Sequence, residues 1–387
     1  MVAIEADSRE IRRAIEKLVN LSTACGAEFS RDVTIRCKQG SLSVASKGGK
    51  GKGKDEDFIR LPRRSLPRLD HFQFGLDGDE LVLAEWSEAA PPLHVQIIDA
   101  LINLYNLCGK AAMHRRVSPW LLLSEQPELV PILAEGRDEP VLSHLIERLR
   151  LGDISNIAID TFLLSRLLRI DKVAVLMPVG ELVNHSALAR PYYFPPNQEG
   201  GGVAVRRTQF PERFGDECFV SYGTFDSLDS WLIYNFIEEH ANFMRSVPVK
   251  IDLPGAGMIR VHAYIAPADH PSPPPELADL SPYLPQVLDR SERSIAVSFL
   301  LIPAAQSQTL RRVLRWVIGQ LSPGNPQADA LVEMAERQIL DKNWAYYEAF
   351  RKGLQGVKLK DPDKLPVLDS LSSLCALQLA RLIEYGK

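Results

Sequence analysis

The sequence predicts an α+β fold in which a β-rich domain of short strands contains a helical insertion and is followed by a helical C-terminal domain. Three observations predict it. Short runs of β-branched and apolar residues, bounded by glycine or proline, lie on both sides of a long helical section. Within that section apolar residues recur at helical spacing. A proline-rich segment then precedes helical patterns that continue through the remaining residues.

The N-terminal part combines one helix with several strands. Residues 8–22 begin with a serine and place Ile11, Ile15 and Leu18 on one face, which predicts an amphipathic helix. Three strands are expected after it, at Val33–Cys37, Leu42–Ala45 and Phe58–Leu61. Pro62 closes the third strand because proline cannot donate a ladder hydrogen bond.

A glycine-lysine tract joins the second and third strands, and residues 48–54 match the phosphate-binding pattern G-x-x-x-x-G-K. A phosphate-binding loop continues with Ser or Thr and then a helix. Here Asp55, Glu56 and Asp57 follow, and a strand comes next. These carboxylates would stand where phosphates bind, so the tract is interpreted as a solvated loop.

Helical spacing dominates from about His94 to Leu168. Later strands are expected at Val173–Met177, Val203–Arg206, Cys218–Tyr222 and Arg260–Ile265, and later helices at Leu310–Leu321, Ala328–Tyr347 and Leu368–Ile383. The predicted domains are 1–70 and 169–266 for the two parts of the β-rich domain, 71–168 for the helical insertion, 267–285 for a proline-rich linker, and 286–387 for the helical C-terminal domain.

Bulk properties favour a globular protein that acts on neither nucleic acid nor membrane. The 387 residues carry a net charge of -4 with a pI near 6.1, which argues against a nucleic-acid surface. Apolar runs fall short of the roughly 20 residues that span a bilayer.

The first residues lack a basic and apolar leader, so no secretory signal is expected. Five scattered cysteines without C-x-x-C spacing predict neither disulfides nor zinc, and we expect a cytoplasmic location and no metal.

Two polar turns stand out, each at the end of an apolar run. Residues 176–183 are mostly apolar and stop at Asn184-His185-Ser186. A second apolar run ends at Tyr222-Gly223, and a helical run closes with Tyr234. Asn-His-Ser alone is ordinary turn chemistry, and a tyrosine in an apolar run is by default a core residue. The order and spacing of the segments together carry more information than any one of them.

These segments resemble the SET-domain methyltransferases of the Rubisco large-subunit lysine methyltransferase type, which include the actin-histidine methyltransferase. The resemblance rests on Ser165-Arg166, on the run from Pro178 to Asn184-His185, on Gly215-Asp216-Glu217 leading to Tyr222-Gly223, and on Tyr234-Asn235-Phe236. Residues 40–45 and 58–62 are similar to the family's N-terminal Gly-x-Gly-x-Val-Ala and Val-Leu-x-Ile-Pro segments. The resemblance is specific between about Thr161 and Phe236.

The resemblance implies a SET fold and S-adenosylmethionine as the cofactor. The residues implied to bind it are Gln39, Gly40, Ser41, Arg166, Asn184, His185 and Tyr222. Arg166 would pair with the cofactor carboxylate, and the Asn184-His185 segment would hold the amino-acid portion and adenine. Tyr222 and Tyr234 are the implied catalytic residues, with Tyr222 at the methyl-transfer channel and Tyr234 shaping its wall.

Some positions depart from the family pattern. Leu42 replaces the second glycine of the N-terminal motif, and Glu181 stands where aspartate is usual. Asn235 replaces the glycine of Tyr-Gly-Phe, and asparagine tolerates a left-handed backbone better than most residues.

Three functions stay open from the sequence. The first is methylation of a protein lysine, or less favourably a histidine, with the protein substrate bound through the SET groove and the C-terminal helical lobe. The second keeps the fold and cofactor but takes a small metabolite as substrate. The third is a degenerate SET module that serves as an interaction scaffold without catalysis.

Overall fold

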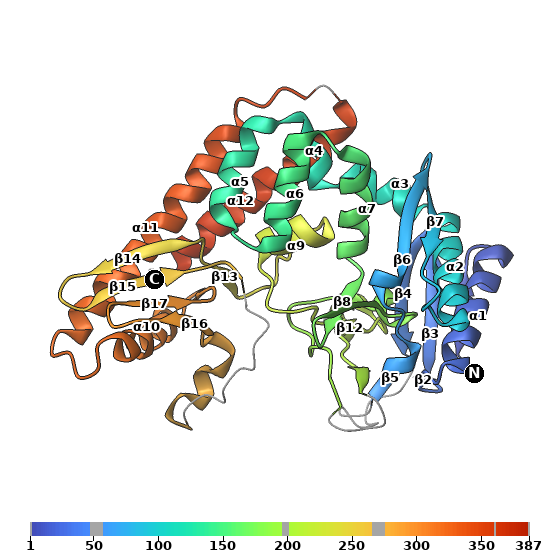
Figure 1. Ribbon diagram of the computed structural model, residues 1–387, viewed down its shortest axis with the longest axis horizontal. Coiled ribbons are helices and arrows are strands. Elements are labelled where there is room, and N and C mark those ends of the chain that lie inside the picture. The colour runs from blue at the N-terminus through green and yellow to red at the C-terminus, as the bar shows by residue number, and fades with distance from the viewer. Residues whose placement is uncertain (1, 47–56, 196–200, 265–274, 360, 386–387) are drawn as a thin grey trace. The chain divides into compact units, whose positions relative to one another are not determined.

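The computed structural model describes residues 2–46, 57–195, 201–264, 275–359 and 361–385 (Figure 1). Two compact units share the chain. The first contains Met1–Val117 with Ala158–Thr224, and the second contains Ser118–Ile157 with Phe225–Lys387. Small sheets and helices occur in both, so the predicted α+β class is confirmed.

The first unit opens with a helix against a three-stranded sheet. Helix α1 (Arg9–Ala24) begins where Ser8 Oγ accepts a hydrogen bond from the N–H of Ile11 at 3.1 Å. The strands β1 (Ala3–Ala6), β3 (Val33–Lys38) and β4 (Ser41–Ser46) lie in the order β1-β3-β4, with β1 parallel to β3 and β4 antiparallel to it. The helix and two of these strands therefore form where the sequence predicts them.

Four further sheets belong to this unit. Strands β2 (Glu28–Phe29), β5 (Asp57–Pro62) and β11 (Gly202–Arg206) form one sheet, and the three pairs are β6 (Phe72–Asp77) with β7 (Glu80–Trp86), β8 (Leu167–Ile170) with β9 (Val173–Leu176), and β10 (Asn184–His185) with β12 (Phe219–Val220). The β6–β7 hairpin lies inside the section that the sequence assigned to the helical insertion. Phe72, Phe74 and Leu76 alternate with polar residues or glycine along β6, which is the pattern of a strand with one solvent-facing side.

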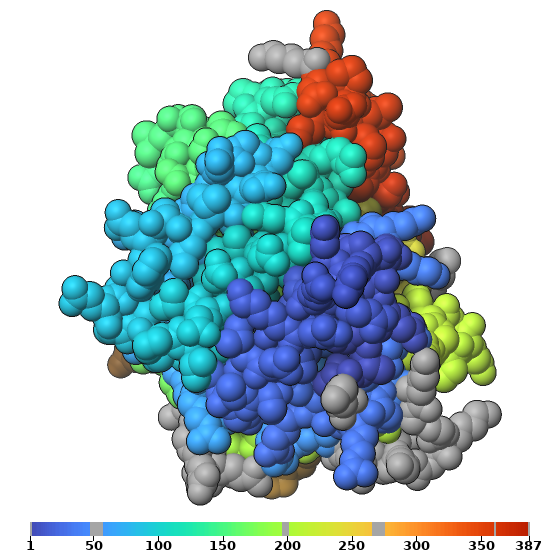
Figure 2. All heavy atoms as spheres, turned by 90° about the vertical axis from the view of Figure 1, so that its right-hand side faces the viewer, coloured from blue at the N-terminus to red at the C-terminus, as the bar shows by residue number. Residues whose placement is uncertain are grey.

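The helices of the first unit are α1, α2 (Pro92–Leu107), α3 (Lys110–Val117), α8 (Pro211–Phe214) and the C-terminal part of α7 (Ile154–Leu164). Short 3₁₀ turns occur at η1 (Arg63–Ser65), η2 (Leu69–His71) and η4 (Gly180–Leu182). Helices α1 and α2 pack side by side, on the face that Figure 2 presents. One continuous apolar core lies beneath them, and its fully buried members include Ile15, Leu18, Ile35, Val44, Ile59, Ile97 and Leu104.

Helices and one larger sheet make up the second unit. The helices are α4 (Pro119–Glu125), α5 (Val130–Gly136), α6 (Pro140–Leu151), α9 (Ser227–Tyr234), α10 (Ser307–Leu321), α11 (Ala328–Leu354) and α12 (Leu365–Tyr385), with 3₁₀ turns η3 (Pro127–Leu129), η5 (Pro275–Tyr283) and η6 (Pro362–Lys364). Strands β14 (Val249–Leu253), β15 (Gly257–Val261), β17 (Ser294–Val297) and β16 (Val287–Arg290) form a sheet in that order, and β13 (Phe243–Arg245) pairs with β18 (Leu301–Pro303). Helix α11 packs on β14, and α10 packs on β17 (Figure 1).

Expectations from the sequence and the observed elements agree best for helices. The three C-terminal helices appear as α10, α11 and α12, and β16 to β18 add strands beside them. The glycine-lysine tract and residues 265–274 lie outside the described residues, so neither the solvated loop nor the start of the linker is tested. The domain boundaries drawn from the sequence stay predictions.

A buried ion network holds α9 in the second unit. Arg137 pairs with Asp229 at 2.7 Å and with Asp226 at 3.0 Å, and Arg245 pairs with Asp229 at 2.9 Å. Asp226 also caps α9 by accepting hydrogen bonds from backbone N–H groups of the first turn. All four side chains are at most 3% exposed, so each charge depends on its partners rather than on water.

Helix α12 with its preceding turn, Pro362–Tyr385, is long and apolar enough to cross a membrane by length and composition alone. Core helices of globular proteins pass the same test. Within the second unit, its Gln378 donates a hydrogen bond to Asp226, and Arg381 donates to Ser227. These buried polar contacts indicate a core helix of a folded unit.

Candidate functional site

The two polar turns that the sequence singled out meet in the first unit. Strand β10 pairs in parallel with β12, so that Asn184 lies opposite Phe219 and His185 opposite Val220. The backbone N–H of Tyr222, just beyond β12, donates to Nδ1 of His185 at 3.1 Å. The two rings lie 5.0 Å apart between centroids. Residues far apart in sequence thus form one cluster.

Tyr222 is held by its hydroxyl and by its ring. The hydroxyl donates to the backbone carbonyl of Val183 at 2.8 Å. The ring stacks on Tyr192, with centroids 6.1 Å apart and planes 5° from parallel. Burial raises the pKa of Tyr222, the negative charge of Glu181 raises it further, and Arg166 acts against both. The phenol therefore stays protonated at neutral pH and acts as a hydrogen-bond donor.

Asn184 has a fixed side-chain orientation. Its Nδ2 donates to Oε1 of Glu217 at 2.7 Å, and Glu217 comes two residues before β12. A charged acceptor strengthens this hydrogen bond. This hydrogen bond connects β10 to the residues just before β12, in addition to the pairing of the two strands.

Glu181, in η4, carries the most unusual carboxylate of the cluster. The hydroxyl of Tyr105 donates to Oε1. Oε2 is shielded from solvent and has no hydrogen-bond partner among the described residues. Burial raises the Glu181 pKa to about 7, although Arg166, the Tyr105 hydrogen bond and Lys110 pull it down. At neutral pH this group is therefore poised between its two protonation states.

Arg166 follows α7 and packs on aromatic rings. Its guanidinium carbon lies 3.6 Å from the centroid of Phe162 and 5.2 Å from that of Tyr105. Nη1 donates to the Phe162 carbonyl at 2.9 Å and to Ser165 Oγ at 2.7 Å. Cation–π contacts orient the planar guanidinium. The resemblance assigns Arg166 to this site. In the structure, the positive charge of Arg166 acts against the rise in the pKa of both Glu181 and Tyr222.

Lys110 and Tyr105 were not anticipated from the sequence. Burial lowers the Lys110 pKa, and the positive charge of Arg166 lowers it further. Tyr105 lies on the apolar face of α2, where a tyrosine is by default a core residue. The one available signal was Gly109, which ends α2 and lets the chain turn so that α3 starts at Lys110.

The predicted cofactor segment Gln39-Gly40-Ser41 is a hairpin turn. Lys38 pairs with Ser41, so Gln39 and Gly40 form a two-residue loop, and both have positive φ, 51° and 73°. The N–H of Gln39 donates to Asp7. A Cβ on Gly40 would lie 2.7 Å from the carbonyl oxygen of Cys108, so this turn lies against the end of α2.

Two cysteine thiols lie beneath that turn. Sγ of Cys37, on β3, is 3.5 Å from Sγ of Cys108, and both residues are buried. Burial and the neighbouring thiol raise the pKa of Cys108 to about 12. The five cysteines are free and buried.

Tyr234, the second predicted catalytic residue, belongs to the second unit. It ends α9, and its ring lies 5.5 Å from Phe225 and 6.1 Å from Phe236 between centroids. Asn235 caps the helix in the left-handed conformation, with φ 64° and ψ 25°, as its tolerance for that region suggests. Tyr234 is therefore not among the residues that the first unit brings together.

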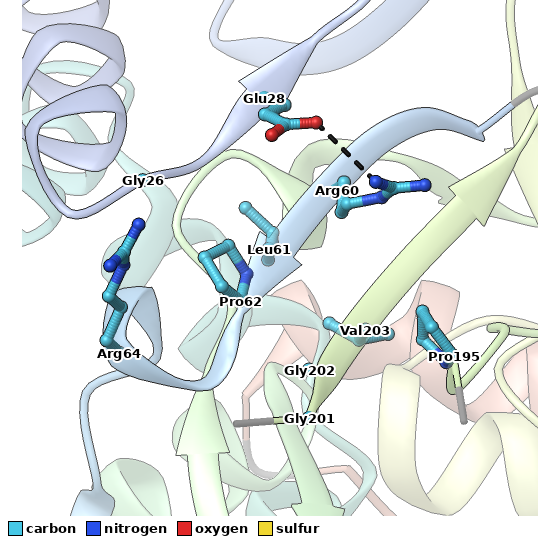
Figure 3. A pocket seen from close by; sticks show the side chains of 10 residues that line it. All are labelled: Gly26, Glu28, Arg60, Leu61, Pro62, Arg64, Pro195, Gly201, Gly202 and Val203. Atoms are coloured by element: carbon cyan, nitrogen blue, oxygen red, sulfur yellow. Dashed lines mark ion pairs between the residues drawn. The ribbon is translucent and has the colours of Figure 1, made fainter. Parts of the chain in front are cut away.

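A pocket of about 410 Å³ lies elsewhere in the first unit (Figure 3). Its lining residues are Gly26, Glu28, Arg60, Leu61, Pro62, Arg64, Pro195, Gly201, Gly202 and Val203. Arg60 faces Glu28 across it at 3.7 Å and also pairs with Asp57 at 2.7 Å. None of the predicted cofactor residues lines this pocket. Of its two arginines, Arg60 is paired with carboxylates, and Arg64 donates a hydrogen bond to the carbonyl of Cys25.

In the described parts of the chain, no group of three His, Cys, Asp or Glu side chains lies close enough together to hold a metal ion. Acids and bases of the site are instead the carboxylate of Glu181, the imidazole of His185 and the phenols of Tyr105 and Tyr222. Such a set can bind and orient a charged organic ligand.

Comparisons with known proteins give limited information. No protein-family model matches the sequence, and no curated protein matches it. Among solved structures, it is similar to the SET domain of LSMT bound to lysine and AdoHcy, at 12% identity and a TM-score of 0.39, over 97% of this chain and 89% of that chain. The same domain bound to methyllysine and AdoHcy matches at 12% identity and a TM-score of 0.35, over 95% and 93% of the two chains. Rubisco LSMT bound to AdoMet matches at 12% identity and a TM-score of 0.35, over 96% and 89%. These TM-scores are too low to establish a shared fold.

Proposed function

We propose that the chain is an S-adenosylmethionine-dependent N-methyltransferase with a SET fold, and that its target is a protein lysine, with histidine as the less favoured target. One observation carries the proposal. The Asn184-His185 turn and the Tyr222 turn, which the resemblance assigns to one site, pair as neighbouring strands, and Tyr222 bonds directly to His185. Arg166 and Glu181 lie in the same electrostatic cluster.

The residues present suit this cofactor. The donor would supply an electrophilic methyl group on a sulfonium, together with an amino-acid end that carries a carboxylate and an ammonium. Arg166 has no carboxylate within 4.0 Å among the described residues, and Glu181 Oε2 has no hydrogen-bond partner there. Asn184, His185 and the Gln39-Gly40-Ser41 turn would complete the binding residues.

The chain itself would orient the accepting amine and exclude water. A lysine amine attacks only when neutral, and its ordinary pKa of about 10.4 makes the neutral form rare in water. A partly buried site lowers that pKa. The Tyr222 hydroxyl, anchored on the Val183 carbonyl, would line the path of the amine. Alignment of this kind accelerates displacement reactions without a strong general base.

Calorimetric titration with S-adenosylmethionine tests the proposal. Wild type should bind, and Arg166→Ala combined with Asn184→Ala should weaken binding by about a hundredfold, since each removes a hydrogen bond to a charged or polar group. Arg68→Ala, at an exposed arginine paired with Asp70, is the control and should bind as wild type does. A wild-type chain that does not bind, or a double variant with undiminished affinity, contradicts the proposal.

The class of substrate is tested with a labelled methyl donor and cell lysate. Label in a protein band supports protein methylation, in which the helical C-terminal domain would contact the substrate. Label confined to the low-mass fraction supports a metabolite. No transfer at all, with binding partners recovered on the intact chain, supports the interaction scaffold. A cytoplasmic location belongs to the same proposal.

A further inference from the structure

Asp7 connects the end of β1 to the Gln39-Gly40-Ser41 turn, although 32 positions separate it from Gln39. Strand β1 pairs in parallel with β3, and Ala6 lies opposite Cys37 near the end of both strands. Asp7 follows Ala6, and its carboxylate accepts a hydrogen bond from the backbone N–H of Gln39. The strand pairing therefore brings this carboxylate to the first residue of the turn.

The turn has a conformation that its own residues do not favour. Gln39 and Gly40 have φ of 51° and 73°, in the left-handed region. Glycine adopts this region freely, whereas a residue with a Cβ does so at a cost, and two-residue hairpin turns favour Asn or Asp before the glycine. Gln39 lacks this advantage. The turn therefore depends on contacts from outside the hairpin.

Asp7 supplies one such contact, and α2 supplies another. The loop residues of a two-residue hairpin take no part in its ladder, so the N–H of Gln39 needs a separate acceptor, and a charged acceptor makes the stronger hydrogen bond. On the other side, a Cβ on Gly40 would lie 2.7 Å from the carbonyl oxygen of Cys108, so the turn has no room to shift toward α2. Asp7 is itself held in place, because β1 ends one residue before it and Ser8 caps α1 directly after it.

We infer that Asp7 is a positioning residue for the methyl donor, and that it acts by holding the Gln39-Gly40-Ser41 turn in the conformation that binds the donor. Asp7 acts through the N–H of Gln39 and not by touching the donor. The inference rests on the proposed function, which assigns this turn to the donor site. It extends that site to β1, a strand that the sequence analysis did not predict.

Hydrogen exchange on the chain without donor tests the first step. Asp7→Ala removes the acceptor, so the amide proton of Gln39 should exchange with solvent at least about fivefold faster than in wild type. Asp7→Asn keeps a side-chain oxygen that accepts, and its exchange rate should stay within about twofold of wild type. Asp99→Ala removes an exposed carboxylate that pairs with Lys17 at 3.2 Å in the same unit, and it should leave the exchange of this amide unchanged.

Calorimetric titration with S-adenosylmethionine tests the second step. Asp7→Ala should raise the dissociation constant by about threefold to tenfold, the usual effect of losing one hydrogen bond. Asp7→Asn and Asp99→Ala should bind as wild type does. Gln39→Asn in the Asp7→Ala background should restore most of the affinity, because asparagine favours the left-handed conformation without outside support. Asp7 is exposed, so each variant should stay folded, which thermal unfolding checks.

The outcomes separate the inference from the proposed function. Faster exchange and weaker binding in Asp7→Ala, with recovery in the double variant, support the inference. Wild-type exchange or affinity in Asp7→Ala, or no recovery in the double variant, overturns it and leaves the proposed function standing. So does an Asp7→Ala chain that is unfolded at the titration temperature, since Asp7 would then support the whole unit. A wild-type chain that does not bind the donor overturns the proposed function, and the inference with it.

Discussion

The backbone N–H of Tyr222 donates a hydrogen bond to Nδ1 of His185, a residue 37 positions earlier in the chain. Because Nδ1 accepts, the neutral imidazole carries its proton on Nε2. The bond also fixes where the Tyr222 side chain starts, so that its hydroxyl reaches the carbonyl of Val183. The geometry of Tyr222 therefore depends on both polar turns at once.

Tyr222→Phe should slow methyl transfer and leave donor binding nearly intact. The change removes the hydroxyl that bonds to Val183, at a cost of about 1 kcal/mol in the free energy of unfolding. Loss of alignment should lower the single-turnover transfer rate by about a hundredfold. Tyr193→Phe is the matched control, because the Tyr193 ring packs under Arg206 in the same unit. Equal transfer rates for Tyr222→Phe and wild type would count against a role in catalysis.

Glu181 should make stability depend on pH. Its pKa is about 7 in the folded chain and near the ordinary 4.5 when unfolded, because burial penalises the charged form. Between pH 4.5 and 7 the folded state binds more protons than the unfolded state. The stability contributed by this group is therefore present below pH 4.5 and is lost as pH rises to 7, by at most about 3 kcal/mol.

The Glu181→Gln variant removes that dependence. Denaturant unfolding at pH 5 and pH 8 should show the variant gaining stability relative to wild type as pH rises. Glu85→Gln, at an exposed position on β7, should follow the wild-type slope. Parallel pH profiles for Glu181→Gln and wild type would mean that the carboxyl is not held as described.

Arg137→Met should destabilise the second unit strongly. The variant leaves Asp226 and Asp229 buried without their shared cation, which costs about 3–5 kcal/mol in the free energy of unfolding. Arg315→Ala breaks an exposed pair with Asp329 and should cost less than about 0.5 kcal/mol. Thermal unfolding of both variants gives the comparison, and similar melting temperatures would show that the buried network contributes little.

Gly40→Ala should be more damaging than Gly78→Ala. Both glycines have positive φ, 73° and 60°, so each substitution strains the backbone by about 1 kcal/mol. A methyl group on Gly40 would also lie 2.7 Å from the Cys108 carbonyl, whereas nothing lies within 4 Å of one on Gly78. Chemical denaturation should show a difference of at least about 1 kcal/mol. Equal losses would mean that the turn is free to move away from α2.

The native thiols should resist modification. Burial raises the pKa of Cys108, Cys218 and Cys375 to about 12 each, and the thiolate is the reactive form. Ellman's reagent at pH 8 should release little chromophore from native protein within minutes and should detect five thiols after denaturation. Ser372→Cys, at an exposed position on α12, should add one fast thiol. Fast reaction of wild type would show that a buried cysteine opens to solvent.

Local patterns predicted many individual elements well. Ser8 before an amphipathic run predicts the start of α1, and the helical spacing after residue 307 predicts α10 to α12. These signals depend on neighbours within a turn or two of helix, so the sequence carries them directly. The hairpin β6–β7 was not predicted, although Phe72, Phe74 and Leu76 alternate with polar residues or glycine along β6, as in a strand with one solvent-facing side.

The residues of the candidate site were likewise predicted only in part from the sequence. The resemblance to the SET-domain family assigned Asn184, His185, Tyr222 and Arg166 to one site, because these residues follow the order and spacing of the family's motifs. Only the tertiary structure joined β10 to β12 and brought Tyr105, from the helical insertion, into hydrogen-bond contact with Glu181. The physical reason is that a shared electrostatic environment depends on distance in space. Burial and missing counter-ions exist only after segments that are remote in sequence have packed together.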